Sequence, residues 1–380
     1  ADRLTDKFGG RVIAHSRFGT AKWILSDRVW ANVADDVSPG DDLPPSVDFV
    51  TARTEFYTHP TALPQVAQSS IKQDLHRRDF TINTLAIRLD PDHWGELLDF
   101  YGGEEDLEYE VIRVLHSLSF IDDPTRILRA ARLESRLGFH LDLRSEELID
   151  DALPLLRRVS GDRIRHELEL IFREDEPERA LCRLDELGAL SPIHPGLECD
   201  NWLITKYRTL RESLDSETWE LASEDLVFVH LALLTYRMDE EQVHALSERL
   251  KVKRNVEEDL LLVQNLRKRL PELVELDRPS ETYHLLQPYP ARVMAVVWVA
   301  TGDATAKERL LRHQTEWRFV EPELTGDDLK DMGLEPGPFF GHLLRELRDA
   351  RLNGEVRTRE EEVALVEQVL ADEDLLVEEG

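Results

Sequence analysis

The sequence predicts an α+β fold, with a mixed sheet in an amino-terminal head and an all-α remainder. Short runs rich in β-branched and aromatic residues, separated by turns, occur at residues 11–14, 21–25 and 46–52. From about residue 116 onward, apolar residues recur at helical spacing instead. The chain of 380 residues is long enough for several domains. We therefore expect four parts: a head at 1–115, a neck at 116–190, a body at 191–315 and a tail at 316–380.

The element boundaries follow from the same patterns. Residues 57–70 are predicted as a loop, and residues 82–89 as a strand or a short helix followed by a strand. Breaks are expected near Pro192 and near Pro288. Helices are predicted at 145–157, 161–173, 177–187, 202–214, 224–236, 239–250, 254–270, 279–286, 290–300, 305–315, 326–332, 338–352 and 358–372.

The bulk composition narrows the class of protein. The formal net charge is -30, which argues against nucleic-acid binding unless the basic residues are clustered. Cys182 and Cys199 lack the close spacing of a metal or redox motif, so we expect two ordinary thiols in a reducing compartment. No apolar run is long enough for a membrane span and no signal peptide is visible, which predicts a cytoplasmic protein without a membrane partner. No protein partner is predicted.

Residues 74–86 form the most unusual stretch of the chain. Five of the six residues from Asp74 to Asp79 are charged or ionisable, and apolar residues then alternate with Thr81, Asn83 and Thr84. A solvated surface would explain the first half, and a buried segment would explain the second. We interpret the abrupt change as the wall of a binding site. Adjacent arginines suit phosphate, and a neighbouring carboxylate suits a sugar hydroxyl.

A second candidate segment covers residues 122–132. On a helix, Asp123, Arg126, Arg129 and Arg132 step by three and lie along one face. The alternative is a surface helix with many salt bridges. One carboxylate and one guanidinium on a rigid helix can complement the edge of a nucleobase. The remaining arginines would suit a triphosphate.

These segments, together with four others in order along the chain, carry a resemblance to a known family. They are Phe-Gly-Thr-Ala at 18–21, Asp-Phe-Val-Thr-Ala-Arg at 48–53, Arg-Arg-Asp-Phe-Thr-Ile-Asn at 77–83, Asp-Phe-Tyr-Gly-Gly at 99–103, Asp-Asp-Pro-Thr-Arg at 122–126 and Ser-Gly-Asp-Arg-Ile at 160–164. The sequence resembles the class II tRNA nucleotidyltransferases, which are the CCA-adding and A-adding enzymes, and the bacterial poly(A) polymerases. The resemblance implies a polymerase-beta-like nucleotidyltransferase head followed by a helical neck, body and tail.

The family implies a reaction and a set of site residues. The reaction is template-independent addition of CCA, or of its A, to tRNA 3′ ends from CTP and ATP by two-metal phosphoryl transfer with Mg²⁺. Arg78 would contact phosphate, Asp79 the ribose and Asn83 the triphosphate. Asp123 and Arg126 would read the base. Further implied roles are nucleotide binding for Arg53, Arg129 and Arg132, metal binding and catalysis for Asp48, and the neck motif for Asp162 and Arg163.

One departure from the family is serious. The family opens with a glycine-glycine phosphate loop and an Asp-x-Asp pair that binds two magnesium ions, whereas Gly9-Gly10 here precedes a strand that matches the segment after that pair. Asp48 alone cannot hold both ions. We therefore expect residues 1–380 to bind nucleotide weakly and to transfer essentially nothing, while a version extended at the amino end is active.

RNA is expected to bind to basic residues, mostly of the helical half, by phosphate contacts and by the shape of an A-form stem. The candidates are Arg157, Arg158, Arg165, Lys251, Lys253 and Arg254, with Arg309, Arg312 and His313 as further ones. Three alternatives stay open at this point: A-only or poly(A) addition, with the base choice set by the 57–74 loop; a non-catalytic RNA-binding module; and a purely structural helical protein.

Overall fold

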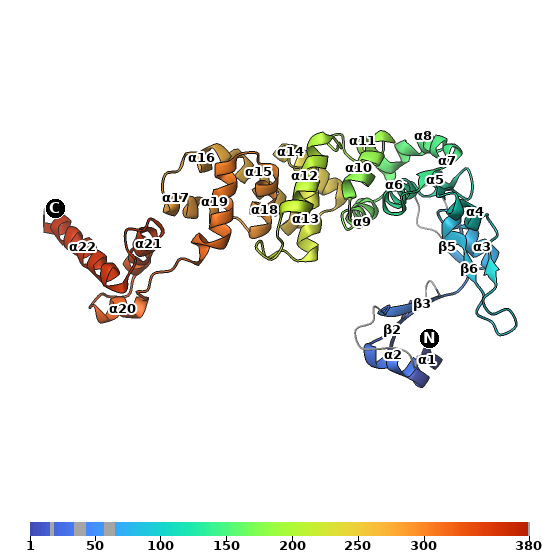
Figure 1. The fold of residues 1–380 in the computed structure, drawn as a ribbon, viewed down its shortest axis with the longest axis horizontal. Helices are drawn as coiled ribbons and strands as arrows, with labels where there is room; N and C mark the ends of the chain where they lie inside the picture. The colour runs from blue at the N-terminus through green and yellow to red at the C-terminus, as the bar shows by residue number, and fades with distance from the viewer. Residues whose placement is uncertain (16–18, 34–42, 57–64, 379–380) are drawn as a thin grey trace. The chain divides into compact units, whose positions relative to one another are not determined.

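The computed structural model describes residues 1–15, 19–33, 43–56 and 65–378 of the chain (Figure 1). Phe18 and the first residues of the 57–74 segment lie outside the described residues. The chain divides into two compact units, Ala1–Val159 and Ser160–Gly380. The predicted α+β head and helical remainder are confirmed. The finer division at 115, 190 and 315 stays a prediction.

The first unit begins with a three-stranded antiparallel sheet in the order β1-β2-β3. Trp23 on the middle strand and Val29 on the second helix form a small core, and the Trp23 indole donates to the Gly9 carbonyl oxygen at 2.9 Å. The sheet and its helices are α1 (Asp2–Phe8), β1 (Arg11–His15), β2 (Thr20–Ile24), α2 (Asp27–Val33) and β3 (Ser46–Val50).

Three two-stranded pairings follow in the same unit. They are β4 (Arg53–Phe56) antiparallel to β5 (Gln65–Gln68), β6 (Ala86–Ile87) antiparallel to β7 (Leu97–Leu98), and β8 (Val111–Ile112) parallel to β9 (His140–Leu141). The prediction of a loop over 57–70 was wrong in its second half, which contains β5. Pairing with β4 makes a strand of β5, whose polar sequence carries little strand propensity of its own.

The helices of the first unit are short except for α6. They are α3 (Ile71–His76), η2 (Thr81–Thr84), α4 (Gly103–Glu108), α5 (Ser119–Asp122), α6 (Thr125–Leu137), α7 (Leu143–Glu147), α8 (Ile149–Ala152) and η3 (Leu153–Arg158). The single helix predicted at 145–157 is therefore wrong; Pro154 stands in the first turn of η3 and cannot continue a helix that precedes it. α6 ends at Gly138, whose φ of 72° is the left-handed conformation that glycine favours.

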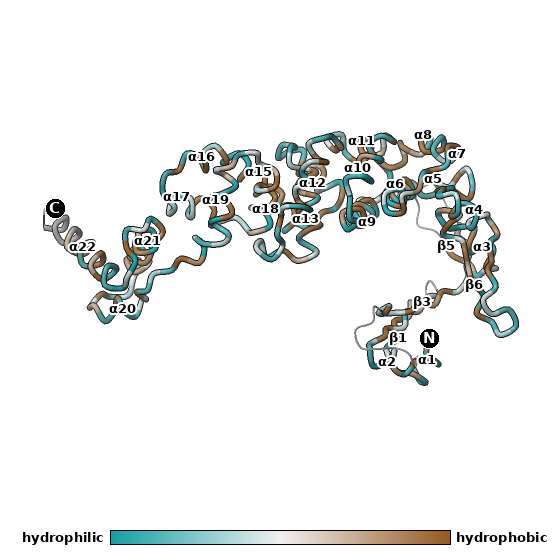
Figure 2. Tube along the Cα trace, in the orientation of Figure 1, coloured by the Kyte–Doolittle hydropathy of each residue, from teal (hydrophilic) through white to brown (hydrophobic). Residues whose placement is uncertain are grey.

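The second unit is helical throughout its described residues. Figure 2 shows hydrophobic and hydrophilic residues alternating along most of its helices, as expected for helices with one buried face. The helices are α9 (Gly161–Ile171), α10 (Pro177–Glu186), α11 (Leu190–Ile193), α12 (Asn201–Ser213), α13 (Ser223–Leu234), α14 (Glu240–Leu250), α15 (Arg254–Lys268), α16 (Leu270–Glu275), α17 (Pro279–Leu286), α18 (Ala291–Ala300), α19 (Ala304–Thr315), η4 (Trp317–Phe319), α20 (Gly326–Asp331), α21 (Pro338–Leu352) and α22 (Arg359–Glu378).

Helix α18 lies at the centre of the second unit. Val293, Val296 and Val297 are completely buried, and the helix packs on α12, α13, α15 and α19. The carboxy-terminal helices have a core of their own around Leu329, Leu343 and Val366. No helix among the described residues is long and apolar enough to cross a membrane.

His313 on α19 corrects one of the predicted RNA contacts. Its side chain is buried beside the ring of Tyr283, and its Nδ1 has no hydrogen-bond partner. Burial, together with the charge of Arg318, lowers its pKa from 6.5 to about 4. A neutral, buried imidazole cannot bind a phosphate of RNA. His313 was predicted as an RNA contact because it follows Arg309 and Arg312 in the sequence. The helix periodicity alone did not reveal which of these three side chains is buried.

This buried imidazole predicts a pH dependence of stability. The unfolded state takes up a proton near pH 6.5 and the folded state only near pH 4, so the contribution of His313 to stability is complete above pH 6.5 and is lost as the pH falls. Between pH 7 and pH 5 we expect a loss of about 2 kcal/mol from this residue. Urea titrations of wild type and His313→Leu at both pH values check it. A wild-type loss that persists unchanged in the variant would assign the effect to other groups.

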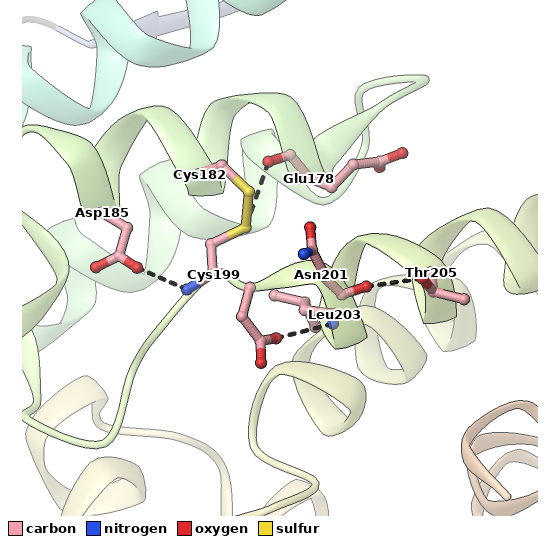
Figure 3. The surroundings of a disulfide bond; sticks show 8 residues. Glu178, Cys182, Asp185, Cys199, Asn201, Leu203 and Thr205 are labelled. Atoms are coloured by element: carbon pink, nitrogen blue, oxygen red, sulfur yellow. Dashed lines mark hydrogen bonds between the residues drawn. A yellow bond between two sulfur atoms is a disulfide. The ribbon is translucent and has the colours of Figure 1, made fainter.

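The two cysteines correct a second expectation, because they form a disulfide and are not free thiols. Cys182 on α10 and Cys199 just before α12 are 17 residues apart, with 4.8 Å between their Cα atoms (Figure 3). The chain turns back at His194–Leu197, and the Asp185 carboxylate accepts from the Cys199 amide at 2.9 Å. Sequence spacing does not reveal such a return of the chain.

Removal of the disulfide is expected to lower the stability of the second unit. Closing a loop of 17 residues restricts the unfolded chain by about 3 kcal/mol in the chain-entropy model. We expect the Cys182→Ser, Cys199→Ser double variant to unfold at lower urea concentration than the wild type, and reductant to produce the same change. Thiol titration of the denatured, unreduced protein provides the control, since two reactive thiols per chain would contradict the pairing.

Candidate nucleotide site

The Arg77–Asp79 corner is held between two fixed elements. Helix α3 starts at Ser70, whose hydroxyl accepts from the Gln73 amide, and ends at His76. After the corner, Phe80 is completely buried and forms an isolated bridge with Val114. The charged residues therefore lie on a turn whose two ends cannot move independently. The predicted change from surface to buried segment corresponds to this turn.

Asp74 organises the near side of the corner. Its carboxylate is buried and accepts from the Arg53 amide at 2.9 Å and from the Arg77 guanidinium at 2.9 Å and 3.1 Å. Arg78 lies farther from it, with 3.8 Å between Nη2 and Oδ2, and stays largely exposed. Arg77 is thus bound within the protein, while Arg78 faces solvent. No role for Asp74 could be predicted from the sequence, because its neighbours in space come from β4 as well as from α3.

Asp79 joins the corner to α6. Its carboxylate accepts from the Asn83 amide group at 2.9 Å, from the Phe80 amide at 3.0 Å and from Arg129 Nη1 at 2.9 Å. Burial alone would raise the pKa of Asp79, but the bonds from Asn83 and Arg129 outweigh burial and leave this pKa below its ordinary value. The carboxylate is therefore ionised at neutral pH. Asp79, Asn83 and Arg129, three of the predicted nucleotide-binding residues, are therefore in contact, although Asp79 and Arg129 are 50 positions apart in the sequence.

Arg126 forms the second link between the two segments. Its side chain is only 5% exposed, and it donates to the Ser119 hydroxyl at 2.5 Å and to the Arg77 carbonyl oxygen at 2.8 Å. Asp123, the other predicted base reader, accepts from the Thr125 amide at 3.0 Å and from the Thr125 hydroxyl at 2.6 Å, and so fixes the start of α6. The arginines of the 122–132 segment were predicted along one face of the helix, but Arg126 and Arg129 contact different partners. Arg129 reaches Asp79, while Arg126 reaches Arg77.

Helix α4 supports the corner from behind. Thr81 donates to the buried Asp106 at 2.6 Å, and Arg113 donates to both oxygens of Asp106 at 3.1 Å. Gly103 permits this contact, because a Cβ atom there would lie 2.4 Å from the Thr81 carbonyl oxygen. Packing thus requires the second glycine of the Asp-Phe-Tyr-Gly-Gly segment, whereas the first, Gly102, has the left-handed φ of 73° that glycine favours.

A pocket of about 480 Å³ opens beside the corner. Its wall includes the buried Arg126 together with Arg77 and Lys72. His76, His116 and Tyr101 complete the wall of the pocket. The sequence did not predict them as site residues. Its only indication was that His76 lies in the 74–86 stretch and Tyr101 in the Asp-Phe-Tyr-Gly-Gly segment. The full lining is Thr54, Lys72, Gln73, His76, Arg77, Tyr101, His116, Asp122 and Arg126.

Asp48, the predicted metal ligand, does not lie in a group of metal-binding side chains among the described residues. Asp48 lies on β3 with a side chain that is 61% exposed, and it pairs with Lys22 of β2 at 3.7 Å. Within the part of the chain that the structure describes, no group of three or more histidine, cysteine or acidic side chains can hold a metal ion. These residues do not fit a two-magnesium site, so we derive no catalytic step through metal.

The predicted neck and RNA-binding residues fall into bound and exposed groups. Arg165 is bound by α14, since it donates to the Leu250 carbonyl oxygen at 3.0 Å, and Lys251 pairs with Asp162 at 3.2 Å. Asp162 and Lys251 are nevertheless exposed, as are Arg157, Arg158, Lys253 and Arg254. Arg163 is half-buried on α9. Arg165 therefore positions α9, and RNA binding by the exposed basic residues stays a prediction.

Comparison with known proteins places this geometry in a family. Residues 20–113 match the Poly A polymerase head domain, and residues 138–200 match the probable RNA and SrmB-binding site of polymerase A. The chain is 34% identical over 96% of its length to an A-adding tRNA nucleotidyltransferase of Geobacter sulfurreducens. It is 31% identical over 83% of its length to a CC-adding tRNA nucleotidyltransferase of Deinococcus radiodurans and covers 71% of that protein.

A solved structure gives the same result. The Thermotoga maritima CCA-adding enzyme complexed with tRNA superposes with a TM-score of 0.73 at 28% identity, covering 98% of this chain and 83% of that one. A nucleotidyltransferase-type head with a helical remainder is thus the class that the fold defines. The chain belongs to the family of tRNA nucleotidyltransferases and poly(A) polymerases, which confirms the resemblance. It spans 41% of the length of the Geobacter relative.

Proposed function

We propose that this chain binds a nucleoside triphosphate and tRNA and acts in the addition of nucleotides to tRNA 3′ ends. One observation carries the proposal: Arg129 and Arg126 of α6 reach the Arg77–Asp79 corner, at 2.9 Å from Asp79 and 2.8 Å from the Arg77 carbonyl oxygen. Two segments with phosphate-binding and sugar-binding chemistry are thereby joined in one place. A surface helix with local salt bridges would not make these contacts.

The proposed roles follow the contacts. Arg78 is exposed and makes only long contacts, at 3.8 Å to Asp74 and 3.4 Å to the Asn83 carbonyl oxygen, so its guanidinium can meet phosphates. The ionised Asp79 can accept a ribose hydroxyl in the direction left open by Asn83 and Arg129. Arg126 is too deeply buried to read a whole base edge and presents only the part of its guanidinium that borders the pocket. Base reading by Asp123 and Arg126, and phosphate binding by Arg53, Asn83, Arg129 and Arg132, remain proposals.

We propose addition of the terminal A from ATP as the reaction to test first. The Geobacter relative is named A-adding, the Deinococcus relative CC-adding, and the Thermotoga neighbour CCA-adding. CCA addition with CTP and ATP is the second candidate. We propose Mg²⁺ as the metal and the cytoplasm as the compartment from the family resemblance, and any Mg²⁺ site would need carboxylates in addition to Asp48.

Nucleotide incorporation tests the proposal directly. tRNA transcripts that end before the CCA sequence, after its first two nucleotides, or after the complete sequence are incubated with labelled ATP or CTP and Mg²⁺. We expect a version of the chain extended at the amino end to extend only the transcript that ends in CC, and by a single A. Extension of all three by many residues would establish poly(A) synthesis. Absence of both tRNA binding and extension would refute the proposal.

A further inference from the structure

Three aromatic rings lie in a row on one wall of the 480 Å³ pocket. The imidazoles of His76 and His116 stack with their centroids 5.3 Å apart and their planes 16° apart. The Tyr101 ring also lies beside His76, with a centroid distance of 5.5 Å and its plane tilted by 56°. Its hydroxyl donates to the Lys72 carbonyl oxygen at 2.8 Å, which ties the row to α3. The rings come from three separate segments of the chain and line the same pocket.

The pocket carries a net positive charge, whereas the whole chain has a net charge of -30. Of its nine lining side chains, Lys72, Arg77 and Arg126 are cationic and only Asp122 is anionic. The whole chain, by contrast, has 47 basic and 77 acidic residues. Arg77 is already neutralised by Asp74, so Lys72 and the buried Arg126 supply the excess positive charge. Such a pocket favours an anion.

The histidine nearest to Arg126 is held in its neutral form. Burial lowers the pKa of His116, and the charge of Arg126 lowers it further, while Asp122 acts in the opposite direction. A neutral imidazole offers a flat aromatic face without an added charge. The wall thus combines uncharged ring surface with cations at its edge, the combination that binds bases by stacking and phosphates by charge.

We propose that this pocket takes a nucleoside phosphate whose base stacks on the row of His76, His116 and Tyr101 and whose phosphate lies near Lys72. The inference rests on the proposed function and adds to it the residues that contact the base. The volume suits one nucleotide, since ligand pockets of about 300–1,000 Å³ hold molecules of that size. The occupant is either a free triphosphate or the 3′-terminal nucleotide of an RNA strand, which share this chemistry.

Leucine substitutions of the two histidines test the proposal. ATP, tripolyphosphate and a fluorescent 12-nucleotide RNA ending in CC are titrated into wild type, His116→Leu and His76→Leu. Base–aromatic stacking accounts for about 1–3 kcal/mol per base, so we expect at least about a tenfold loss of affinity for the probe that occupies the pocket. Tripolyphosphate, which has no base, should bind within about twofold of wild type. Loss for ATP identifies the incoming nucleotide as the occupant, and loss for the RNA alone identifies its terminal nucleotide.

Two further variants separate stacking from folding. His116→Phe keeps a flat ring and should retain most of the affinity. His93→Leu makes the same change at an exposed histidine that pairs with Asp90 outside the pocket, and should have no effect. Wild-type binding that survives both leucine substitutions overturns this inference alone, as does an equal loss for tripolyphosphate. A wild-type chain that binds neither ATP nor RNA overturns the inference together with the proposed function.

Discussion

Asp79→Ala is expected to loosen the nucleotide site and to remove nucleotide binding. The carboxylate is the shared acceptor for Asn83, Arg129 and the Phe80 amide, and it is only 9% exposed. Removing one member of a buried ion pair leaves the other charge without compensation, which costs about 3–5 kcal/mol. Because Arg129 is partly exposed, we expect about 3 kcal/mol. Urea titration gives the loss, and hydrogen exchange of residues 74–86 shows whether it is local.

The control for Asp79→Ala is an equally charged but exposed pair. Asp90 bonds to Arg88 at 2.8 Å at the surface of the same unit, and exposed ion pairs contribute about 0–1 kcal/mol. Asp90→Ala should therefore leave exchange at 74–86 unchanged. Equal effects of the two substitutions would show that Asp79 is not the organising acceptor of the corner.

Asp79 also has a defined pH signature. Its pKa is lowered below the ordinary value of 3.8, so its contribution to stability is complete above that pH and is lost as the pH falls through the folded-state pKa. The difference in stability between wild type and Asp79→Asn should be constant from pH 7 to pH 5 and should decrease below pH 3.8. A difference that changes around neutral pH would implicate a histidine.

The sequence was informative where periodicity determines structure. The helix predicted at 338–352 is α21 (Pro338–Leu352). The one predicted at 254–270 ends at Lys268, and α16, which carries Pro271, begins at Leu270. Residues 82–89 contain the end of η2 followed by β6, one of the two alternatives. In each case local spacing and proline position were sufficient.

The sequence was uninformative where long-range pairing decides. The 3.6-residue period placed Arg126 and Arg129 near one face of α6 (Thr125–Leu137). It gave no means to predict that Arg129 meets Asp79 and that Arg126 meets the Arg77 carbonyl oxygen. The same limit applies to Arg165, which looked like an RNA contact and bonds to the end of α14. Polar residues at buried contacts resemble surface residues in a sequence, because composition does not reveal their partners.

Gly161→Ala is expected to give a large loss of stability in the helical unit. Gly161 begins α9, and a Cβ atom on it would lie 2.2 Å from the Arg249 carbonyl oxygen and 3.0 Å from the Leu250 carbonyl carbon. Both obstacles are backbone atoms at the end of α14, so α9 must move away from α14. That movement would also break the bond from Arg165 to the Leu250 carbonyl oxygen. Overpacking of this kind costs about 1–3 kcal/mol and occasionally more, and we expect the upper end.

Thermal unfolding measures this effect against a matched glycine. For a unit of this size, about 3 kcal/mol corresponds to a decrease in Tm of about 6–12 °C. Gly341→Ala on α21 is the control, because a Cβ atom there meets nothing within 4 Å, and alanine in a helix should be neutral or stabilising by up to about 1 kcal/mol. Since α9 carries Asp162 and Arg163, displacement of this helix should also weaken tRNA binding. A Gly161→Ala protein with the Tm and tRNA affinity of the wild type would show that α9 does not depend on this close approach.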